Sequence, residues 1–501
     1  MRIAADPRVD TLSIQIQEII RDCSTNFWYP LDNPVLLGFD IGNDDLIRGL
    51  AAELSRRFDN ASSPAERRII QLKTVTLFHG LHLELQEEGD SLDDIINPYD
   101  IRVFPQSFDP RDRINSRSIR EEGRFRQLPS AQRRLVARLF HGKERPYQVL
   151  DDGYYVFSNS HELDGHISRK VLKGTFKTVK PGFCMDLSGN LRPFVKEVIN
   201  LDSWQEVFDH FIEIEMHRRL ANGPLRGRIP TIRMVQNFRK KNGQLRTMII
   251  QDQLRPANAK PDTWREMRHT QLRFAELLNR FHQAGVVHGD LKFQHYFLDP
   301  MGHPIFIDLG STRDKGTLYT LDPDVFGGTY YTRDALEIRS GNIDITDRSA
   351  FKIAKQCDIW AWTINFIKKL DRQKMLQALD KFDSSQTPIP PAEIKAYIRN
   401  PDVYINHKKS SRTNRVYRFR VAVLWAIEQT LYNSIDDVEI CLGDLLLRCL
   451  RNSFVKRGPG FTMADVIKHP YWEMADAIDG QAIGRGTARK QRRRKLRQSS
   501  R

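Results

Sequence analysis

Two aspartates, Asp290 and Asp308, lie 18 residues apart in the segment VVHGDLKFQHYFLDPMGHPIFIDLGSTR, which spans residues 286–313. That separation is enough for a loop, two short strands and a turn, and the run HPIFIDLG has the apolar character of a strand. A chain folded in this way can bring both carboxylates to one cleft. The spacing of these two aspartates constrains the fold more than any other feature of the sequence.

The same segment supplies the groups that phosphoryl transfer requires. That reaction asks little covalent chemistry of a protein, but it needs a carboxylate near the acceptor hydroxyl, a cation on the phosphates and carboxylates on Mg²⁺. Asp290 in HGDLK and Asp308 in DLG offer the carboxylates, and Lys292 offers a cation. One short segment therefore offers each of these groups.

HGDLK resembles the catalytic loop of the protein kinase superfamily, usually HRDLK, and DLG resembles its metal-binding DFG. The resemblance implies that Asp290 orients or deprotonates the acceptor hydroxyl, that Lys292 neutralises the γ-phosphate, and that Asp308 holds Mg²⁺. His288 and Gly310 belong to the same two motifs as structural support. Because Lys292 is typical of Ser/Thr kinases, the expected activity is transfer of the ATP γ-phosphate to a protein serine or threonine.

Residues before the loop match further parts of the kinase pattern. Lys196 in PFVKEV resembles the strand lysine that binds the α- and β-phosphates, so that it counts with Asp290 and Lys292 as catalytic. Its expected partner is Glu213 in the helix WQEVFDHFIEIEMHRRL, with Glu215 as the alternative. The resemblance also assigns further residues to the nucleotide pocket, namely Gly174, Val179, Gln251 and Gln253.

Residues after the loop resemble the rest of the kinase pattern. Thr329 in GGTYYTRDALE is expected to hydrogen-bond near the catalytic loop, and Asp334 stands where the motif usually ends in glutamate. Asp358 in CDIWAWTINFIKKL is expected to accept backbone N–H groups of the catalytic loop and to rigidify it. Arg457, in a block that ends in HPYW, is the expected partner of Asp334.

The nucleotide-binding part departs from the pattern in two places. In VLKGTFKTV, Leu172 and Lys177 replace two glycines of the glycine-rich turn and only Gly174 remains, so that backbone amides can approach phosphate at one point only. Phe194 stands where a small alanine normally lies against adenine. We expect it to tighten or displace the nucleotide pocket.

The catalytic loop departs from the pattern in two more places. His295 replaces an asparagine that binds metal, and a neutral imidazole is a softer ligand than Mg²⁺ prefers. ATP with a single Mg²⁺, or with Mn²⁺ instead, is the expected cofactor set, held by Asp308 and His295. Gly289 replaces the arginine that commonly receives an activation-loop phosphate, so we expect activity to be independent of that phosphorylation.

The pattern of apolar residues predicts an α+β body behind a mostly helical region. The resemblance implies that this body has a bilobal protein-kinase-like fold. Residues 1–150 form that helical region, which is either a docking or regulatory domain or an extension packed on its neighbour; Asp10 and Ser63 are expected to cap helices in it. The remaining expected parts are a kinase-like domain at 165–475, with a small lobe at 165–255 and a large lobe at 256–475, an insertion near 370–435, and a basic disordered tail at 476–501.

The composition of the chain indicates where the protein is located and which partners it contacts. The last 21 residues hold nine Arg or Lys and no acid, in a chain of net charge +15. This tail predicts electrostatic contact with nucleic acid, an import receptor or an anionic membrane. No run approaches the roughly 18–20 apolar residues of a membrane span. Five scattered cysteines without a CxxC pair predict a reducing compartment. We therefore expect a cytoplasmic protein, with nuclear entry through the tail.

Two alternatives to a protein kinase stay open at this point. FVK together with a loop ending in H-x-F-L is similar to bacterial lipopolysaccharide core kinases, which suggests a sugar or another small molecule as acceptor. The departures at Phe194 and His295 suggest a pseudokinase, a binding scaffold without turnover. Retention of Lys196, Asp290 and Asp308 favours an enzyme, because a scaffold has no chemical reason to keep all three.

Overall fold

The computed structural model describes part of the 501-residue chain, and the account below concerns these residues. They are 7–23, 25, 43–103, 113–114, 130, 134, 145–150, 153–156, 172–173, 177–186, 191–239, 244–257, 264–315, 348–367, 370, 424, 426–451 and 460–476. The predictions for Gly174, Thr329, Asp334 and Arg457 fall outside them, as do most of the expected insertion and the tail after residue 476.

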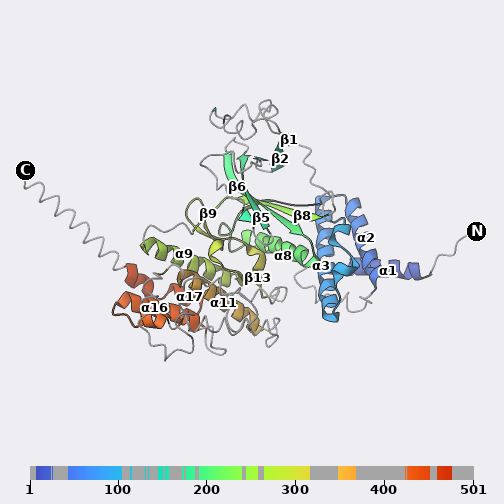
Figure 1. Ribbon diagram of the computed structural model, residues 1–501. Helices are drawn as coiled ribbons and strands as arrows, with labels where there is room; N and C mark the ends of the chain where they lie inside the picture. Colours follow the sequence, from blue (N-terminus) through green and yellow to red (C-terminus); the bar gives the residue numbers. More distant parts are fainter. Residues whose placement is uncertain are drawn as a thin grey trace, which may run out of the picture. The chain divides into compact units, whose positions relative to one another are not determined.

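The chain forms a mixed helical and sheet protein in two compact units (Figure 1). Unit 1 comprises residues 1–215 and 230–254, and unit 2 comprises residues 216–229 and 255–501. The chain crosses between the units three times, and the last crossing, after residue 254, lies near the lobe border that the sequence predicts at residue 255. The expected border between a helical region and a small lobe, at 150–165, lies inside unit 1.

Unit 1 begins with helices, coloured blue in Figure 1, whose ends follow from local chemistry. Ser63 caps the third of them through its hydroxyl, which accepts a hydrogen bond from the Glu66 N–H. Asp10 is not a cap as predicted: the first helix begins three residues earlier at Pro7, whose fixed φ suits a first helical turn. The elements are α1 (Pro7–Asp22), α2 (Asp44–Asn60), α3 (Pro64–Glu88), α4 (Leu92–Ile95) and a 3-10 turn (Pro98–Asp100).

An antiparallel sheet forms the second part of unit 1. Its strand order is β1-β2-β3-β5-β6-β8-β7, and β4 pairs with β5. The strand predicted from RTMIIQDQL is β8, and its run of buried residues fits a strand covered on both faces. The bounds are β1 (Arg113–Ile114), β2 (Arg145–Leu150), β3 (Gly153–Val156), β4 (Leu172–Lys173), β5 (Lys177–Asp186), β6 (Leu191–Leu201), β7 (Ile232–Arg239) and β8 (Leu245–Asp252).

The N-terminal helices and the sheet share one hydrophobic core with α8 (Trp204–Ala221). Trp204 lies at its centre: its ring stacks on Phe78 of α3 with centroids 5.0 Å apart, and its indole N–H donates a 2.8 Å hydrogen bond to the Ile96 carbonyl. Phe208 packs against His79 and His82 of α3. The helices within residues 7–23 and 43–103 therefore pack on the sheet and α8, and a docking or regulatory role for this region stays a prediction.

Unit 2 contains α9, α11 and α16 with short strands. The apolar face of α9 buries Phe274, Leu278 and Phe281, and α11 buries Trp360 and Trp362 completely. The bounds are β9 (Arg255–Pro256), α9 (Trp264–Gln283), β10 (Val286–Val287), β11 (Tyr296–Leu298), β12 (Pro304–Phe306), β13 (Arg313–Asp314), α11 (Arg348–Ile367), a π-helical turn (Glu428–Tyr432), α16 (Asp437–Arg451) and α17 (Met463–Ile467), with 3-10 turns at Phe293–His295 and Leu309–Ser311.

Candidate functional site

A short antiparallel hairpin positions two of the predicted site residues. β11 pairs with β12 in the register Tyr296↔Phe306, and the backbone N–H of Ile307 donates a 3.1 Å hydrogen bond to the carbonyl of His295. His295 directly precedes the first strand, and Asp308 follows the second by two residues. The ladder therefore places their backbones at the same end of the hairpin, as the spacing in the sequence had suggested for a loop, two strands and a turn.

Asp308 has an unusual backbone conformation. Its φ of 61° and ψ of 69° lie in the left-handed region, and it is the one non-glycine residue with positive φ among those that the structure describes. This conformation costs an L-residue about 1–2 kcal/mol. Strain of this kind persists where the surroundings enforce it, and it is concentrated at functional sites. The observed strain makes Asp308 a functional candidate independently of the sequence motif.

Asp290 and Lys292 contact each other in the loop before the hairpin. Lys292 Nζ donates a 2.8 Å hydrogen bond to Asp290 Oδ2. This is a charge-assisted hydrogen bond, which is stronger than a neutral one. The Lys292 side chain is nevertheless 45 % exposed, against 17 % for Asp290, so its ammonium remains accessible from solvent. The loop thus presents a carboxylate and a cation side by side.

Asp290, His295 and Asp308 form a cluster with the composition of a metal site. Each offers one ligand atom, and these three atoms lie within 4.8 Å of one another. His295 Nε2 lies 3.3 Å from Asp308 Oδ2. Two carboxylates and an imidazole fit a divalent cation. The structure thus brings together the predicted general base and both predicted metal ligands.

A buried aspartate of α11 fixes the backbone of this loop. Asp358, which is 1 % exposed, accepts hydrogen bonds of 2.8 Å from the His288 N–H and 3.0 Å from the Gly289 N–H. These are the contacts predicted for Asp358. Its Oδ2 also lies 3.1 Å from His282 Nε2, a partner on α9 that the sequence reading missed. Three partners stabilise a carboxylate that would otherwise be costly to bury.

The imidazole ring of His288 is buried beneath the loop and packs against apolar side chains. It is fully buried and packs edge-on against Phe306 with centroids 5.4 Å apart. Burial lowers the pKa of His288, so the neutral imidazole is the form that the fold favours. Its Nδ1 lies 3.4 Å from the backbone N–H of Asp290 and accepts from it. This contact connects the buried ring to the residue predicted to act as base.

Gly289 is required by the geometry of the loop. Its φ is 79°, and a Cβ at this position would lie 2.4 Å from the Ser311 carbonyl oxygen. A side chain would therefore meet backbone rather than a flexible neighbour. The glycine in place of the usual arginine is thus explained locally by the close approach of the turn at Leu309–Ser311. Whether activity is independent of loop phosphorylation stays a prediction.

In unit 1, Lys196 lies on the central strand β6, opposite Lys180 on β5. Burial, together with the charges of Lys180 and Arg246, lowers the pKa of Lys196 to about 8. An anionic ligand would stabilise the charged form of a lysine in this setting. Lys196 is thus placed on a sheet as predicted, with two further cations near it.

The residues assigned to the nucleotide pocket in unit 1 lie on the same sheet. Val179 pairs with Glu197 across β5 and β6. Gln251 on β8 donates a 2.6 Å hydrogen bond to Glu197 Oε1, and the Gln253 N–H donates to the Pro193 carbonyl. These contacts give Val179, Gln251 and Gln253 structural roles. Their contact with a nucleotide stays a prediction.

Phe194 is accommodated by a glycine on the neighbouring strand. It is 1 % exposed and lies opposite Gly182 in the β5–β6 register. A Cβ on Gly182 would lie 2.4 Å from the ring of Phe194, so the ring covers the space that a side chain would fill. Nothing in the sequence motif pointed to Gly182, because its role depends on the cross-strand register.

Of the two candidate glutamates on α8, Glu215 has a partner on the N-terminal helices. It forms an ion pair with Arg68 of α3, and both side chains are partly buried. The alternative assignment of Glu215 as partner of Lys196 is therefore disfavoured. Glu213 lies on the same helix, and its pairing with Lys196 stays a prediction.

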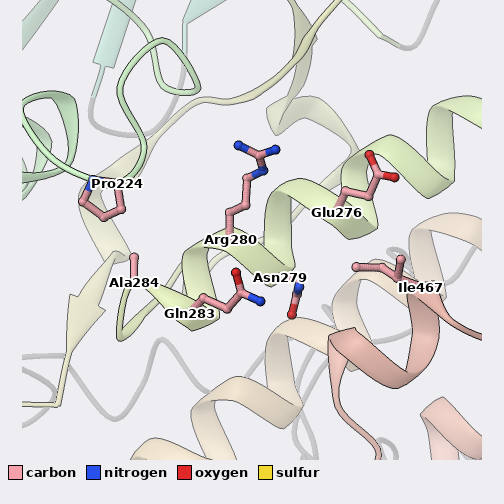
Figure 2. A pocket seen from close by; sticks show the side chains of 7 residues that line it. All are labelled: Pro224, Glu276, Asn279, Arg280, Gln283, Ala284 and Ile467. Atoms are coloured by element: carbon pink, nitrogen blue, oxygen red, sulfur yellow. The ribbon is translucent and has the colours of Figure 1, made fainter.

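A hollow of about 600 Å³ lies along α9 (Figure 2). None of the predicted site residues lines it. The lining side chains are Pro224, Glu276, Asn279, Arg280, Gln283, Ala284 and Ile467. Its mixture of polar and charged groups does not indicate a particular ligand. The candidate site is therefore the loop that carries Asp290, and not this hollow.

Comparison with known proteins gives no relative from which function could be transferred. No protein-family model matches the chain, and no curated protein is detectably similar to it. Within the part of the chain that the structure describes, no helix has the length and apolarity needed to cross a membrane.

Proposed function

We propose that this protein is an ATP-dependent phosphotransferase with a bilobal protein-kinase-like fold, and in its simplest form a Ser/Thr protein kinase. The observation that carries the proposal is the convergence of Asp290, Lys292, His295 and Asp308 at one end of a hairpin. The strained backbone of Asp308 supports it independently.

Each residue of the cluster has a proposed role. Asp290 orients the acceptor hydroxyl and takes up its proton, while Lys292 neutralises the phosphoryl group that is transferred. Asp308 and His295 hold the divalent cation, which when bound offsets the negative charge on the phosphates. The hydrogen bonds to Asp358 keep the loop in place during the reaction, so that no reorganisation is needed at that moment.

Lys196 has the proposed role of binding the α- and β-phosphates of the same nucleotide. Its lowered pKa supports this role, because an ammonium depleted of solvent beside Lys180 and Arg246 is stabilised by an anion. The nucleotide pocket is expected to be shaped by Phe194, whose ring occupies the position of a smaller side chain.

A radiolabelled ATP assay tests the proposal. We expect transfer to general protein substrates in the presence of Mg²⁺ or Mn²⁺, and its loss by at least about 100-fold in Asp290→Asn, which keeps the shape of the side chain but removes the base. Absence of transfer to protein with either ion would overturn the protein kinase assignment. Transfer to a sugar instead would identify a small-molecule kinase.

A binding measurement separates an enzyme from a scaffold. We expect saturable binding of a fluorescent ATP analogue that is lost in Lys196→Ala and in Asp308→Ala. Lys180→Ala is the matched control for Lys196, because it removes an exposed lysine from the neighbouring strand. Its expected effect on nucleotide affinity is about threefold or less. Binding that survives both Lys196→Ala and Asp308→Ala would contradict the proposed site.

A further inference from the structure

His295 is held in one tautomer by the loop that it follows. Its Nδ1 lies 2.7 Å from the carbonyl oxygen of Asp290. A carbonyl oxygen only accepts hydrogen bonds, so Nδ1 must carry the proton. In the neutral ring, Nε2 therefore has a lone pair and no hydrogen.

That lone pair is directed at another acceptor. Nε2 lies 3.3 Å from Asp308 Oδ2, and an ionised carboxylate oxygen only accepts. Two acceptors at this separation repel each other unless a proton or a cation lies with them. Ligands about 2.1 Å from a shared ion are about 3.0 Å apart at octahedral angles and about 3.4 Å apart at tetrahedral angles. The observed separation falls between these values.

The imidazole is also fixed in direction. The ring is 8 % exposed and packs on His288 with centroids 6.1 Å apart and an angle of 24° between the planes. Its backbone carbonyl accepts a hydrogen bond from the N–H of Ile307, the residue that follows β12. A histidine that donates its second N–H to a carbonyl is the usual arrangement around protein-bound metal, since it sets the tautomer and raises the basicity of the ligand nitrogen.

We propose that His295 makes the Asp290–His295–Asp308 cluster selective for a divalent transition ion that binds imidazole nitrogen, with Mn²⁺ and Co²⁺ preferred over Mg²⁺. Mg²⁺ favours oxygen ligands and gives up its water reluctantly, whereas imidazole nitrogen is a common ligand of first-row transition ions. This inference deepens the proposed function and rests on it for the role of the ion in transfer. The ion binding itself is measurable without nucleotide or acceptor.

The test measures Mn²⁺ binding to the full chain without nucleotide, from the loss of the free-ion electron paramagnetic resonance signal, with Mg²⁺ as competitor. We expect Mn²⁺ to bind at least tenfold more tightly than Mg²⁺. His295→Asn supplies an oxygen ligand in place of nitrogen and is expected to lower the Mn²⁺ affinity at least tenfold, with Mg²⁺ affinity changed threefold or less. His303→Asn is the matched control, because His303 lies in the turn of the same hairpin and contacts Asp299 rather than the cluster.

A spectroscopic readout keeps the inference testable if the variant folds poorly. Electron spin echo envelope modulation of bound Mn²⁺ in the unchanged protein is expected to show coupling to one imidazole ¹⁴N. Bound Mn²⁺ without nitrogen coupling, or an unchanged Mn²⁺-to-Mg²⁺ ratio in His295→Asn, would overturn the inference while phosphoryl transfer persists.

Failure to bind either ion has a separate meaning. It would identify the His295–Asp308 contact as a proton-mediated ion pair, and so overturn the inference as well. The radiolabelled ATP assay then decides independently whether the proposed function also fails, since transfer is measured with added ion and nucleotide rather than with ion alone.

Discussion

Asp358 Oδ2 accepts a 2.8 Å hydrogen bond from the backbone N–H of His288, so a buried carboxylate on α11 holds the loop that carries Asp290. Its other oxygen accepts from the Gly289 N–H. One side chain therefore accepts hydrogen bonds from two consecutive backbone N–H groups of the loop. The relationship connects the core of unit 2 directly to the candidate site.

Replacing Asp358 by asparagine is expected to loosen the loop. Asn has one acceptor oxygen, so its amide NH₂ would face one of the two backbone N–H groups. Leaving one buried donor unsatisfied costs about 1–3 kcal/mol. We expect faster amide hydrogen exchange at residues 287–291, measured by mass spectrometry, and lower stability. Unchanged protection of these amides would contradict the role of Asp358.

Asp444→Asn is the control for Asp358→Asn. Asp444 is a partly exposed acid on α16, contacting Arg448 and His469 outside the loop. Its substitution is expected to leave the exchange of residues 287–291 unchanged, which separates a local effect at the loop from a general loss of stability.

Gly289 and Gly302 have similar positive φ angles, so comparing them separates the cost of backbone strain from the cost of a steric clash at Cβ. Gly289 and Gly302 have φ of 79° and 84°, but a Cβ at Gly302 would meet nothing within 4 Å. Gly302→Ala is expected to cost about 1 kcal/mol, the usual penalty for an L-residue in the left-handed region. Gly289→Ala adds a collision with the Ser311 carbonyl oxygen, so its loss in unfolding free energy should be at least twice as large. Equal losses of unfolding free energy for the two variants in denaturant titrations would show that the loop relaxes around the new methyl group without a further cost.

Local patterns predicted the loop and the hairpin, because the 18-residue separation of Asp290 and Asp308 leaves room for a loop, two short strands and a turn. The contact of Asp358 with the loop spans 70 residues, and it was predicted from the family resemblance rather than from local geometry. The packing of α3 on α8 was not predictable in the same way. It joins Phe78 to Trp204, which are 126 residues apart, and helical periodicity gives the buried face of a helix without its partner.

The contacts that the sequence reading missed have the same cause. Arg68 and Glu215 lie in highly charged helices, where the sequence does not distinguish a partly buried ion pair from solvated side chains. Gly182 becomes meaningful only when the register places it opposite Phe194. His282, at the end of an amphipathic helix, offered a weak signal, but its partner Asp358 lies 76 residues further on.

The pairing of Gly182 with Phe194 predicts a strong coupling between two substitutions. Gly182→Ala alone places a methyl group 2.4 Å from the ring and is expected to destabilise by about 1–3 kcal/mol. Phe194→Ala alone leaves a cavity and is expected to cost about 3–5 kcal/mol. In the Phe194→Ala background, Gly182→Ala should be neutral or stabilising, since it fills space and favours the strand.

A double-mutant cycle in urea measures this coupling, with an expected interaction energy of about 1–3 kcal/mol. Additive effects would mean that the ring and the glycine do not meet. The same variants test the pocket: if Phe194 restricts the nucleotide site, Phe194→Ala should raise the affinity for the fluorescent ATP analogue, whereas a purely structural Phe194 predicts no gain.

Acid is expected to weaken the packing of α3 on α8 through His82. His82 is 3 % exposed, and burial lowers its pKa, while its contact with Gln205 opposes that effect only in part. A histidine is half-protonated near pH 6.5 in the unfolded chain. As the pH falls below about 6.5, the unfolded state therefore binds more protons than the folded state, and stability decreases until the lowered folded pKa is reached.

Substituting His82 by glutamine removes the titrating group. The variant is therefore the reference against which the pH dependence of stability is measured. At pH 8 both states of His82 are neutral, so any cost of His82→Gln there reflects packing alone. At pH 5.5 the cost should be smaller, or reversed, because the variant no longer loses stability to protonation at this position. Amide hydrogen exchange of α3 at the two pH values measures the difference in unit 1 directly. An identical cost at both values would mean that His82 does not couple protonation to the packing of α3 on α8.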